Sequence, residues 1–289
     1  MSSIKHYNLP ADDKRTSLTE GVKSALLAVP MHFMSSINIT GISATDLFSM
    51  NTLLGGAIED QTVATLNASR SVWDPEDAWS DCEFKRYSES FPDVRLERNG
   101  ESRPIIGIEL KGWYLLSKEE VPSFRFKAAA DATTVWDILA VFPWSLSNVI
   151  SGSPVLAAPF IEQAKYVADL RTHYWENRSP KAKLVRHPTT TPYPAPGTTY
   201  SDIAVDDGGN NFGRIARIKG LMDDWVLNTM STPLAGISAR WWVRFLKLFD
   251  ERGDEETIRK RFEQIAAAQK HDPAWTDEVV AHVRRLMEM

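Results

Sequence analysis

The chain carries two neighbouring stretches, FPDVRLE at residues 91–97 and PIIGIELKGW at residues 104–113, from which its fold can be argued. From residue 106 to residue 111, large apolar side chains alternate with glycine or charged ones. This is the period of a β-strand with one buried face and one open face. Glu109 and Lys111 therefore share the open face of the predicted strand.

The residues between the two stretches have the composition of a tight turn. Residues 98–103 hold an Asn-Gly pair at positions 99–100, which favours a β-hairpin. The first strand of this hairpin begins with Asp93. If the two strands pair, Asp93 is brought close to Glu109 and Lys111.

Two converging carboxylates with a lysine beside them suit phosphodiester hydrolysis. Mg²⁺ prefers oxygen ligands and keeps water and substrate phosphate oxygens in its remaining positions. The bound cation acidifies a water molecule and neutralises charge that develops on the phosphate, and a neighbouring lysine orients or deprotonates the attacking water. The sequence therefore indicates a metal-dependent nuclease.

The spacing of Glu109 and Lys111 is not decisive by itself. A carboxylate two residues before a lysine also occurs at Asp12 and at Glu83, and such pairs are commonly solvated surface ion pairs of nearly neutral energy. The pair at Glu109 differs because it lies on an alternating apolar strand and follows the one Pro-Asp dipeptide of the chain, at residues 92–93. For this reason we prefer the catalytic interpretation, and an exposed ion pair is its alternative.

The Pro-Asp pair at residues 92–93 and the Glu-Leu-Lys triplet at residues 109–111 resemble the PD-(D/E)xK signature of restriction-endonuclease-like nucleases. The flanking residues resemble type II restriction endonucleases in particular. The resemblance covers residues 45–205 and implies an α/β fold with a restriction-endonuclease-like core, in which a mixed sheet is flanked by helices. In that core a helix, a three-stranded meander, a second helix and a further strand follow one another, and here additional N-terminal and C-terminal helices are expected.

The resemblance also implies roles for individual residues. Asp93 and Glu109 would ligate Mg²⁺, for which Mn²⁺ can substitute, and Lys111 would serve the nucleophilic water. Many members of the family supply a further glutamate from the first core helix. Glu59 is the match that we predict, with Asp60 as its rival.

The chain divides into three predicted parts: residues 1–44 form an N-terminal arm and helix, residues 45–205 form the nuclease core, and residues 206–289 form a helical region. A helix-turn-helix and a dimerisation subdomain are the two interpretations of the last part. Gly55 and Gly56 lower the stability of the first core helix and can mark a close approach to another backbone. Helices are expected at residues 17–29, 44–71, 155–175, 213–229, 235–251, 254–270 and 273–289, with a short helix after residue 74 and a buried central strand at residues 133–144.

Two segments are candidates for contact with DNA. Residues 178–186 carry basic side chains and no acid, which fits either a solvated loop or a phosphate-contacting segment. Residues 210–217 carry asparagine and arginine, which read adenine and guanine edges in the major groove, or they form an ordinary turn. The candidate residues are Lys181, Lys183, Arg186, Asn210, Asn211, Arg214 and Arg217.

The composition is compatible with such an enzyme. The chain has 289 residues, a formal net charge of -5 and a hydrophobic content of 43%, so it can bury a large core and does not coat nucleic acid through bulk positive charge. Its one cysteine, Cys82, excludes an internal disulfide and fits a reducing compartment. No signal peptide or membrane span is evident, so we expect a cytoplasmic protein without a membrane partner.

We interpret the sequence as a Mg²⁺-dependent type II restriction endonuclease that acts on double-stranded DNA. A homodimer is expected, because cutting both strands of a symmetric site needs two active sites related by a dyad. A cognate DNA methyltransferase is expected in the same system. Two alternatives stay open: a structure-selective repair or recombination nuclease on the same core, and a non-catalytic DNA-binding protein that retains the core.

Overall fold

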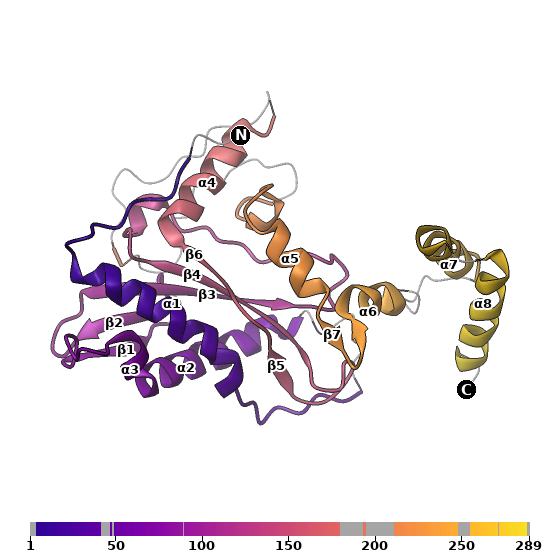
Figure 1. The fold of residues 1–289 in the computed structure, drawn as a ribbon, viewed down its shortest axis with the longest axis horizontal. Helices are drawn as coiled ribbons and strands as arrows, with labels where there is room; N and C mark the ends of the chain where they lie inside the picture. The colour runs from indigo at the N-terminus through magenta and orange to yellow at the C-terminus, as the bar shows by residue number, and fades with distance from the viewer. Residues whose placement is uncertain are drawn as a thin grey trace.

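The structure, a computed structural model, describes residues 4–41, 47, 49–88, 90–179, 193–194, 211–247, 255–270 and 272–287. Its centre is a curled, mixed β-sheet flanked by helices (Figure 1). This arrangement confirms the predicted α/β class. The strand order is β1-β2-β3-β4-β5, and β6 also pairs with β4.

The first three strands form an antiparallel meander. They are β1 (Cys82–Arg86), β2 (Val94–Arg98) and β3 (Pro104–Tyr114). The predicted hairpin between β2 and β3 is confirmed, with Val94 opposite Ile108. The short helix predicted after residue 74 is wrong, because the chain turns there and then pairs with β2 as β1.

The central strand β4 (Ile138–Leu146) is buried at every position and runs parallel to β3. The prediction of a buried central strand in this region is therefore confirmed. Its predicted bounds, residues 133–144, are wrong at both ends. Residues 133–137 are not part of the strand, and β5 (Pro154–Leu156) pairs with residues 144–146 and extends it. The Pro143 carbonyl stays satisfied, since it accepts a hydrogen bond from the Ala157 amide at 2.8 Å.

The helix predicted over residues 155–175 is wrong in its first part. Residues there form β5 and β6 (Phe160–Gln163), and only α4 (Ala164–Asn177) is helical. Both strands pair with β4, on the side opposite to β3. The segment between them contains Pro159, which has no amide hydrogen to donate to a neighbouring strand. The apolar residues Ala164, Val167, Ala168 and Leu170 of α4 are buried.

The first helix, α1 (Lys14–His32), begins earlier and ends later than predicted. Asp13 caps it, since its carboxylate accepts a hydrogen bond from the Arg15 amide at 2.9 Å. Pro30 lies in the last turn and does not end the helix, which there lacks the hydrogen bond that an amide at this position would donate to the Leu26 carbonyl oxygen. The second predicted helix is α2 (Asn51–Ala68), followed by the short α3 (Arg70–Trp73).

Helices cover both faces of the sheet (Figure 1). On one face α2 contacts β1 and β3, α1 contacts β3, and α3 packs against α1. On the other face α4 contacts β4 and β6, and α5 (Asp223–Met230) lies over the strands. Trp225 of α5 contacts Trp113 of β3, with ring centroids 5.4 Å apart. The first core includes Leu18, Val22, Ile58, Phe84, Leu96 and Ile108, and the second includes Phe91, Phe126, Leu139, Val141, Val167 and Ile215.

The C-terminal region is helical in large part, as predicted, with shorter elements. The helix expected over residues 213–229 is reduced to a 3₁₀ turn, η4 (Ile215–Arg217), and α5. The helix expected from residue 235 is preceded by a two-stranded hairpin. The remaining elements are β7 (Pro233–Leu234), β8 (Ile237–Ser238), α6 (Ala239–Leu246), α7 (Glu255–Gln269) and α8 (Pro273–Met287).

The connection between β3 and β4 contains one short element, the 3₁₀ turn η2 (Ala130–Ala132). The helices of the described part of the chain include none that is both long and apolar enough to cross a membrane. The predicted boundaries after residues 44 and 205 fall on residues that the structure does not describe, and they stay predictions.

Close packing of α1 against α3 yields a stability prediction at Gly21. A Cβ atom at this position would stand 2.7 Å from the Cα atom of Trp73 and 2.9 Å from its carbonyl oxygen. We expect Gly21→Ala to lower the free energy of unfolding by about 1–3 kcal/mol, because backbone atoms cannot swing away as a flexible side chain would. Urea unfolding followed by circular dichroism measures the change.

The matched control is Gly55→Ala in α2, where nothing lies within 4 Å of the added Cβ. This substitution should raise the free energy of unfolding by about 0.5–1 kcal/mol, because alanine favours the helix interior. A Gly21→Ala protein as stable as the wild type would contradict the described contact between α1 and α3.

Candidate active site

The predicted site residues meet at a step in the sheet, where β1 ends, β2 begins and β3 runs on. Asp93 directly precedes β2, whereas Glu109 and Lys111 lie in the middle of β3. The β2–β3 register places Asp93 next to this part of β3. The Leu110 amide donates a hydrogen bond of 2.8 Å to Oδ2 of Asp93, which fixes the carboxylate at the strand edge.

Lys111 joins the two carboxylates. Its Nζ atom lies 2.5 Å from Oε1 of Glu109 and 3.8 Å from Oδ2 of Asp93. It also donates a hydrogen bond of 3.0 Å to the Leu110 carbonyl oxygen. The structure therefore brings together the three residues that the sequence singles out.

The expected open face of β3 is wrong at Glu109. This residue is 6% exposed, because Phe91, Phe126 and neighbouring apolar residues pack over the same face of the sheet. Burial raises the pKa of Glu109 well above its usual value, the negative charge of Asp93 raises it further, and Lys111 offsets this in part. The raised pKa favours a protonated Glu109 in the absence of metal, and a divalent cation would replace that proton between the two carboxylates.

Glu59 reaches the edge of this site from α2. Its side chain is 18% exposed, and its Oε2 atom accepts a hydrogen bond of 2.7 Å from Nε of Arg86. Burial raises the pKa of Glu59, and the charges of Asp93 and Lys111 act on it as well. Asp60, the rival candidate, has a side chain that is 64% exposed, so Glu59 is the better placed of the two.

Gly107 allows the turn that carries Asp93 to lie against β3. A Cβ atom on Gly107 would stand 2.2 Å from Cγ of Pro92 and 3.0 Å from Oδ1 of Asp137. No side chain other than hydrogen fits between them. The sequence pattern of β3 did not predict this contact, because Asp137 lies 30 residues further along the chain.

Asp137 is a buried residue that sequence reasoning missed. Its carboxylate accepts hydrogen bonds from the amides of Gly107, at 2.8 Å, and Thr134, at 2.7 Å. The Tyr193 hydroxyl donates a third bond of 2.8 Å. Burial raises the pKa of Asp137 from 3.8 to about 6, although these hydrogen bonds favour the ionised form. Asp137 thus fixes β3 two residues before Glu109.

The donor set fits Mg²⁺. In the described part of the chain no group of three or more His, Cys, Asp or Glu side chains is arranged to hold a metal ion, so the protein offers the two carboxylates of Asp93 and Glu109. Mg²⁺ is commonly bound by one or two carboxylates, with water and substrate phosphate oxygens completing its octahedron. The two converging carboxylates therefore meet the requirements of this cation once Glu109 has released its proton.

The candidate DNA-contacting residues are only in part described. Lys181, Lys183, Arg186 and Asn210 lie outside the described residues.

Asn211 is half-buried and Arg217 is exposed, whereas the Arg214 guanidinium is paired with Glu119 at 3.2 Å. The Phe126 amide donates a hydrogen bond to Gly213, and the Phe126 ring contacts Phe91, which connects this segment to the turn before Asp93.

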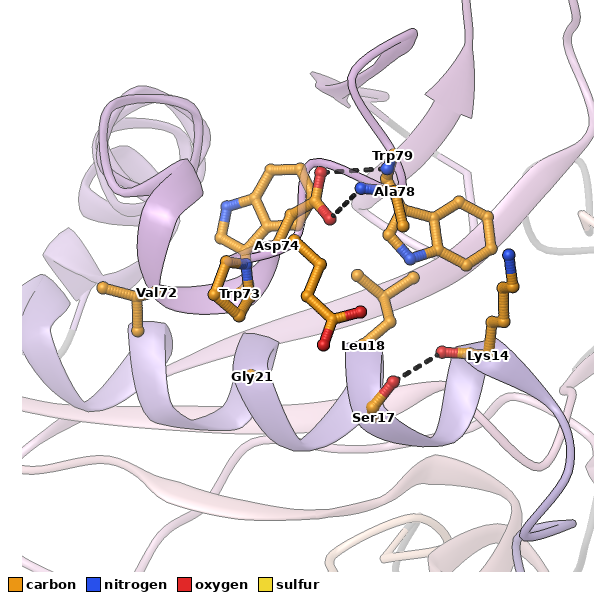
Figure 2. Close-up of a pocket in the computed structure, with 11 residues that line it drawn as sticks. Lys14, Ser17, Leu18, Gly21, Val72, Trp73, Asp74, Ala78 and Trp79 are labelled. Carbon is orange, nitrogen blue, oxygen red and sulfur yellow. Dashed lines mark hydrogen bonds between the residues drawn. The ribbon is translucent and has the colours of Figure 1, made fainter.

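A separate cavity of about 250 Å³ lies between α1 and residues 72–79 (Figure 2). None of the predicted site residues lines it. The Asp74 carboxylate in its wall accepts hydrogen bonds from the amides of Ala78 and Trp79, and the Ser17 hydroxyl donates to the Lys14 carbonyl oxygen (Figure 2). These two polar groups are thus already hydrogen-bonded within the protein.

No protein-family model matches the sequence, and no curated protein matches it. The functional argument therefore rests on the geometry and chemistry of the site.

The raised pKa of Asp137 predicts a pH-dependent loss of stability. Between the usual pKa of 3.8 and the folded value of about 6, the folded protein binds the proton more tightly than the unfolded chain does. The free energy of unfolding therefore falls as the pH rises through this window, by about 3 kcal/mol at 1.36 kcal/mol per pKa unit.

Urea unfolding of the wild type and of Asp137→Asn from about pH 4 to about pH 7 measures this effect. Asparagine does not titrate, so the difference in unfolding free energy between the two proteins should change across the window. A difference that is constant with pH would contradict the described environment of Asp137.

Proposed function

We propose that the protein is a Mg²⁺-dependent endonuclease that hydrolyses phosphodiester bonds of double-stranded DNA, in the manner of type II restriction endonucleases. One observation carries the proposal: Lys111 lies 2.5 Å from Glu109 and 3.8 Å from Asp93 at the step in the sheet. Proximity in space of two acids and a lysine supports a hydrolytic site more strongly than the Glu-x-Lys spacing in the sequence does.

Each side chain has a role in this proposal. Asp93 and Glu109 hold Mg²⁺, which supplies charge neutralisation at the phosphate and lowers the pKa of a bound water. Lys111 orients the attacking water through its ammonium group, which now donates to Glu109 and to the Leu110 carbonyl oxygen. The burial of Glu109 excludes bulk water and strengthens these electrostatic interactions.

The architecture supports a restriction-endonuclease-like core in outline. Helix α2 precedes the meander β1–β3, and β4 adds a further strand parallel to β3. One feature departs from the family pattern, because the connection between β3 and β4 holds the short turn η2 where that pattern has a helix. Asp93 nevertheless lies directly before β2, and Glu109 and Lys111 lie on β3, which supports the assignment.

The proposed substrate implies partners. Cleavage of both strands calls for two copies of the site, so a homodimer belongs to the proposal, as does a cognate DNA methyltransferase. Arg217 and Asn211 are the described candidates for contact with bases, together with Asn210. Lys181, Lys183 and Arg186 are the candidates for contact with phosphates. Arg214 is a weaker candidate, because its guanidinium is paired with Glu119.

The first experiment incubates the purified protein with unmethylated plasmid and phage DNA, with and without Mg²⁺. Discrete bands that require Mg²⁺ are expected, and sequencing of the ends then gives the recognition site. Cleavage confined to branched or flapped DNA would favour the structure-selective alternative. DNA that stays intact across all substrates while still binding the protein would favour a non-catalytic DNA-binding role.

Substitutions in the site should abolish cleavage without unfolding the protein. Asp93→Asn, Glu109→Gln and Lys111→Met should each lower the rate by at least about 100-fold, since each removes a group that holds the cation or the water. The matched control is Glu83→Gln, because Glu83 is exposed and begins a second Glu-x-Lys sequence on β1. Cleavage assays at saturating Mg²⁺ measure the effect, and equal losses in the control would refute the assignment.

Binding of a divalent cation should release protons. Because the pKa of Glu109 is raised, its carboxyl group holds a proton at higher pH than a free glutamate does, and the cation must displace it. The affinity for Mn²⁺ should therefore rise with pH. Calorimetric titrations in two buffers of different ionisation enthalpy measure the released protons, and an affinity that does not change with pH would contradict this donor set.

A further inference from the structure

Arg86 lies beside the proposed site and makes two ion pairs with α2. It is the last residue of β1. Its Nε atom donates a hydrogen bond of 2.7 Å to Glu59, and its Nη1 atom lies 3.2 Å from Oδ1 of Asp60. The Arg86 side chain is 34% exposed, so its guanidinium lies at the rim of the step, between the helix and the sheet.

Gly56 makes room for this guanidinium. A Cβ atom at Gly56 would stand 3.1 Å from Nη2 of Arg86, whereas the adjacent Gly55 has nothing within 4 Å. The two glycines of α2 therefore differ: one faces open space and the other faces Arg86. A glycine inside a helix costs about 0.5–1 kcal/mol relative to alanine, so a close approach gives a physical reason for the residue at position 56.

The ion pair with Arg86 favours the ionised form of Glu59. Burial raises the pKa of Glu59, and the hydrogen bond from Arg86 counters this rise. The Asp93 and Lys111 charges also act on Glu59, which places its carboxylate within electrostatic reach of both. Asp60 is largely exposed, so the stronger interaction of Arg86 is the one with Glu59.

We propose that Arg86 is a positioning residue, which holds the Glu59 carboxylate beside the two acids that hold the cation. Gly56 leaves room for its guanidinium against α2. The inference rests on the proposed function, since it assumes a divalent cation near Asp93 and Glu109. Partners that orient the groups around a metal typically contribute 10–100-fold to its affinity or to activity. An isolated ion pair at the surface contributes little.

Binding of Mn²⁺, followed through the paramagnetic resonance signal of the free ion, tests this role without DNA cleavage. Arg86→Met should weaken Mn²⁺ binding by about 10-fold or more, and Arg86→Lys should restore part of it, because an ammonium can still pair with Glu59. Arg86→Met combined with Glu59→Gln should bind no more weakly than Glu59→Gln alone, because Arg86 acts through Glu59. The urea midpoints of these variants show whether each is folded.

The glycine pair supplies a matched control. Gly56→Ala would shift the Arg86 guanidinium by a few tenths of an ångström and should weaken Mn²⁺ binding less than Arg86→Met does, whereas Gly55→Ala adds the same methyl group to the same helix without touching it. Equal Mn²⁺ affinities in these two variants would overturn the role of Gly56. The comparison separates displacement of Arg86 from a general change in helix stability.

The outcomes distinguish the two proposals. If the wild type binds Mn²⁺ and Arg86→Met, while folded, binds it equally well or more tightly, the positioning role is overturned and the proposed function stands. A loss in the double variant that equals the sum of the single losses would likewise overturn action through Glu59. A wild-type protein that binds no Mn²⁺ would overturn both proposals.

Discussion

A buried glutamate beside a second carboxylate is the constraint on which the site depends. Glu109 is 6% exposed, and its ammonium partner, Lys111, lies two residues away on the same strand. Burying like charges is costly unless an opposite charge or a hydrogen bond compensates. Lys111 and the hydrogen bond from the Leu110 amide to Asp93 compensate part of this cost.

The fold compensates the cost of these charges where β2 begins beside β3. The turn before β2 packs directly on Gly107, and the Leu110 amide holds the Asp93 carboxylate. Asp137 fixes Gly107 from the start of β4, so the parallel pairing of β3 and β4 positions the acids as well as forming the core. Helix α2 lies beside the same part of the sheet, where its Glu59 pairs with Arg86 of β1.

Local sequence signals predicted the parts of the fold that local physics determines. The Asn-Gly turn and the alternation after residue 104 led to the hairpin, and an apolar run led to β4. Strands β1, β5 and β6 were missed, because three to five residues carry too little periodicity and their partners lie elsewhere in the chain. The motif identified Asp93 and Glu109. It did not predict the role of Asp137 or the burial of Glu109, because both depend on tertiary packing.

The central claim is that Asp93 and Glu109 together hold a divalent cation. Anomalous diffraction from crystals soaked in Mn²⁺ tests it most directly, because it locates the ion without relying on activity. The account predicts a peak within about 2.0–2.6 Å of a carboxylate oxygen of each residue, and no such peak in crystals of Asp93→Asn. A peak elsewhere, or none in the wild type at saturating Mn²⁺, would contradict the account.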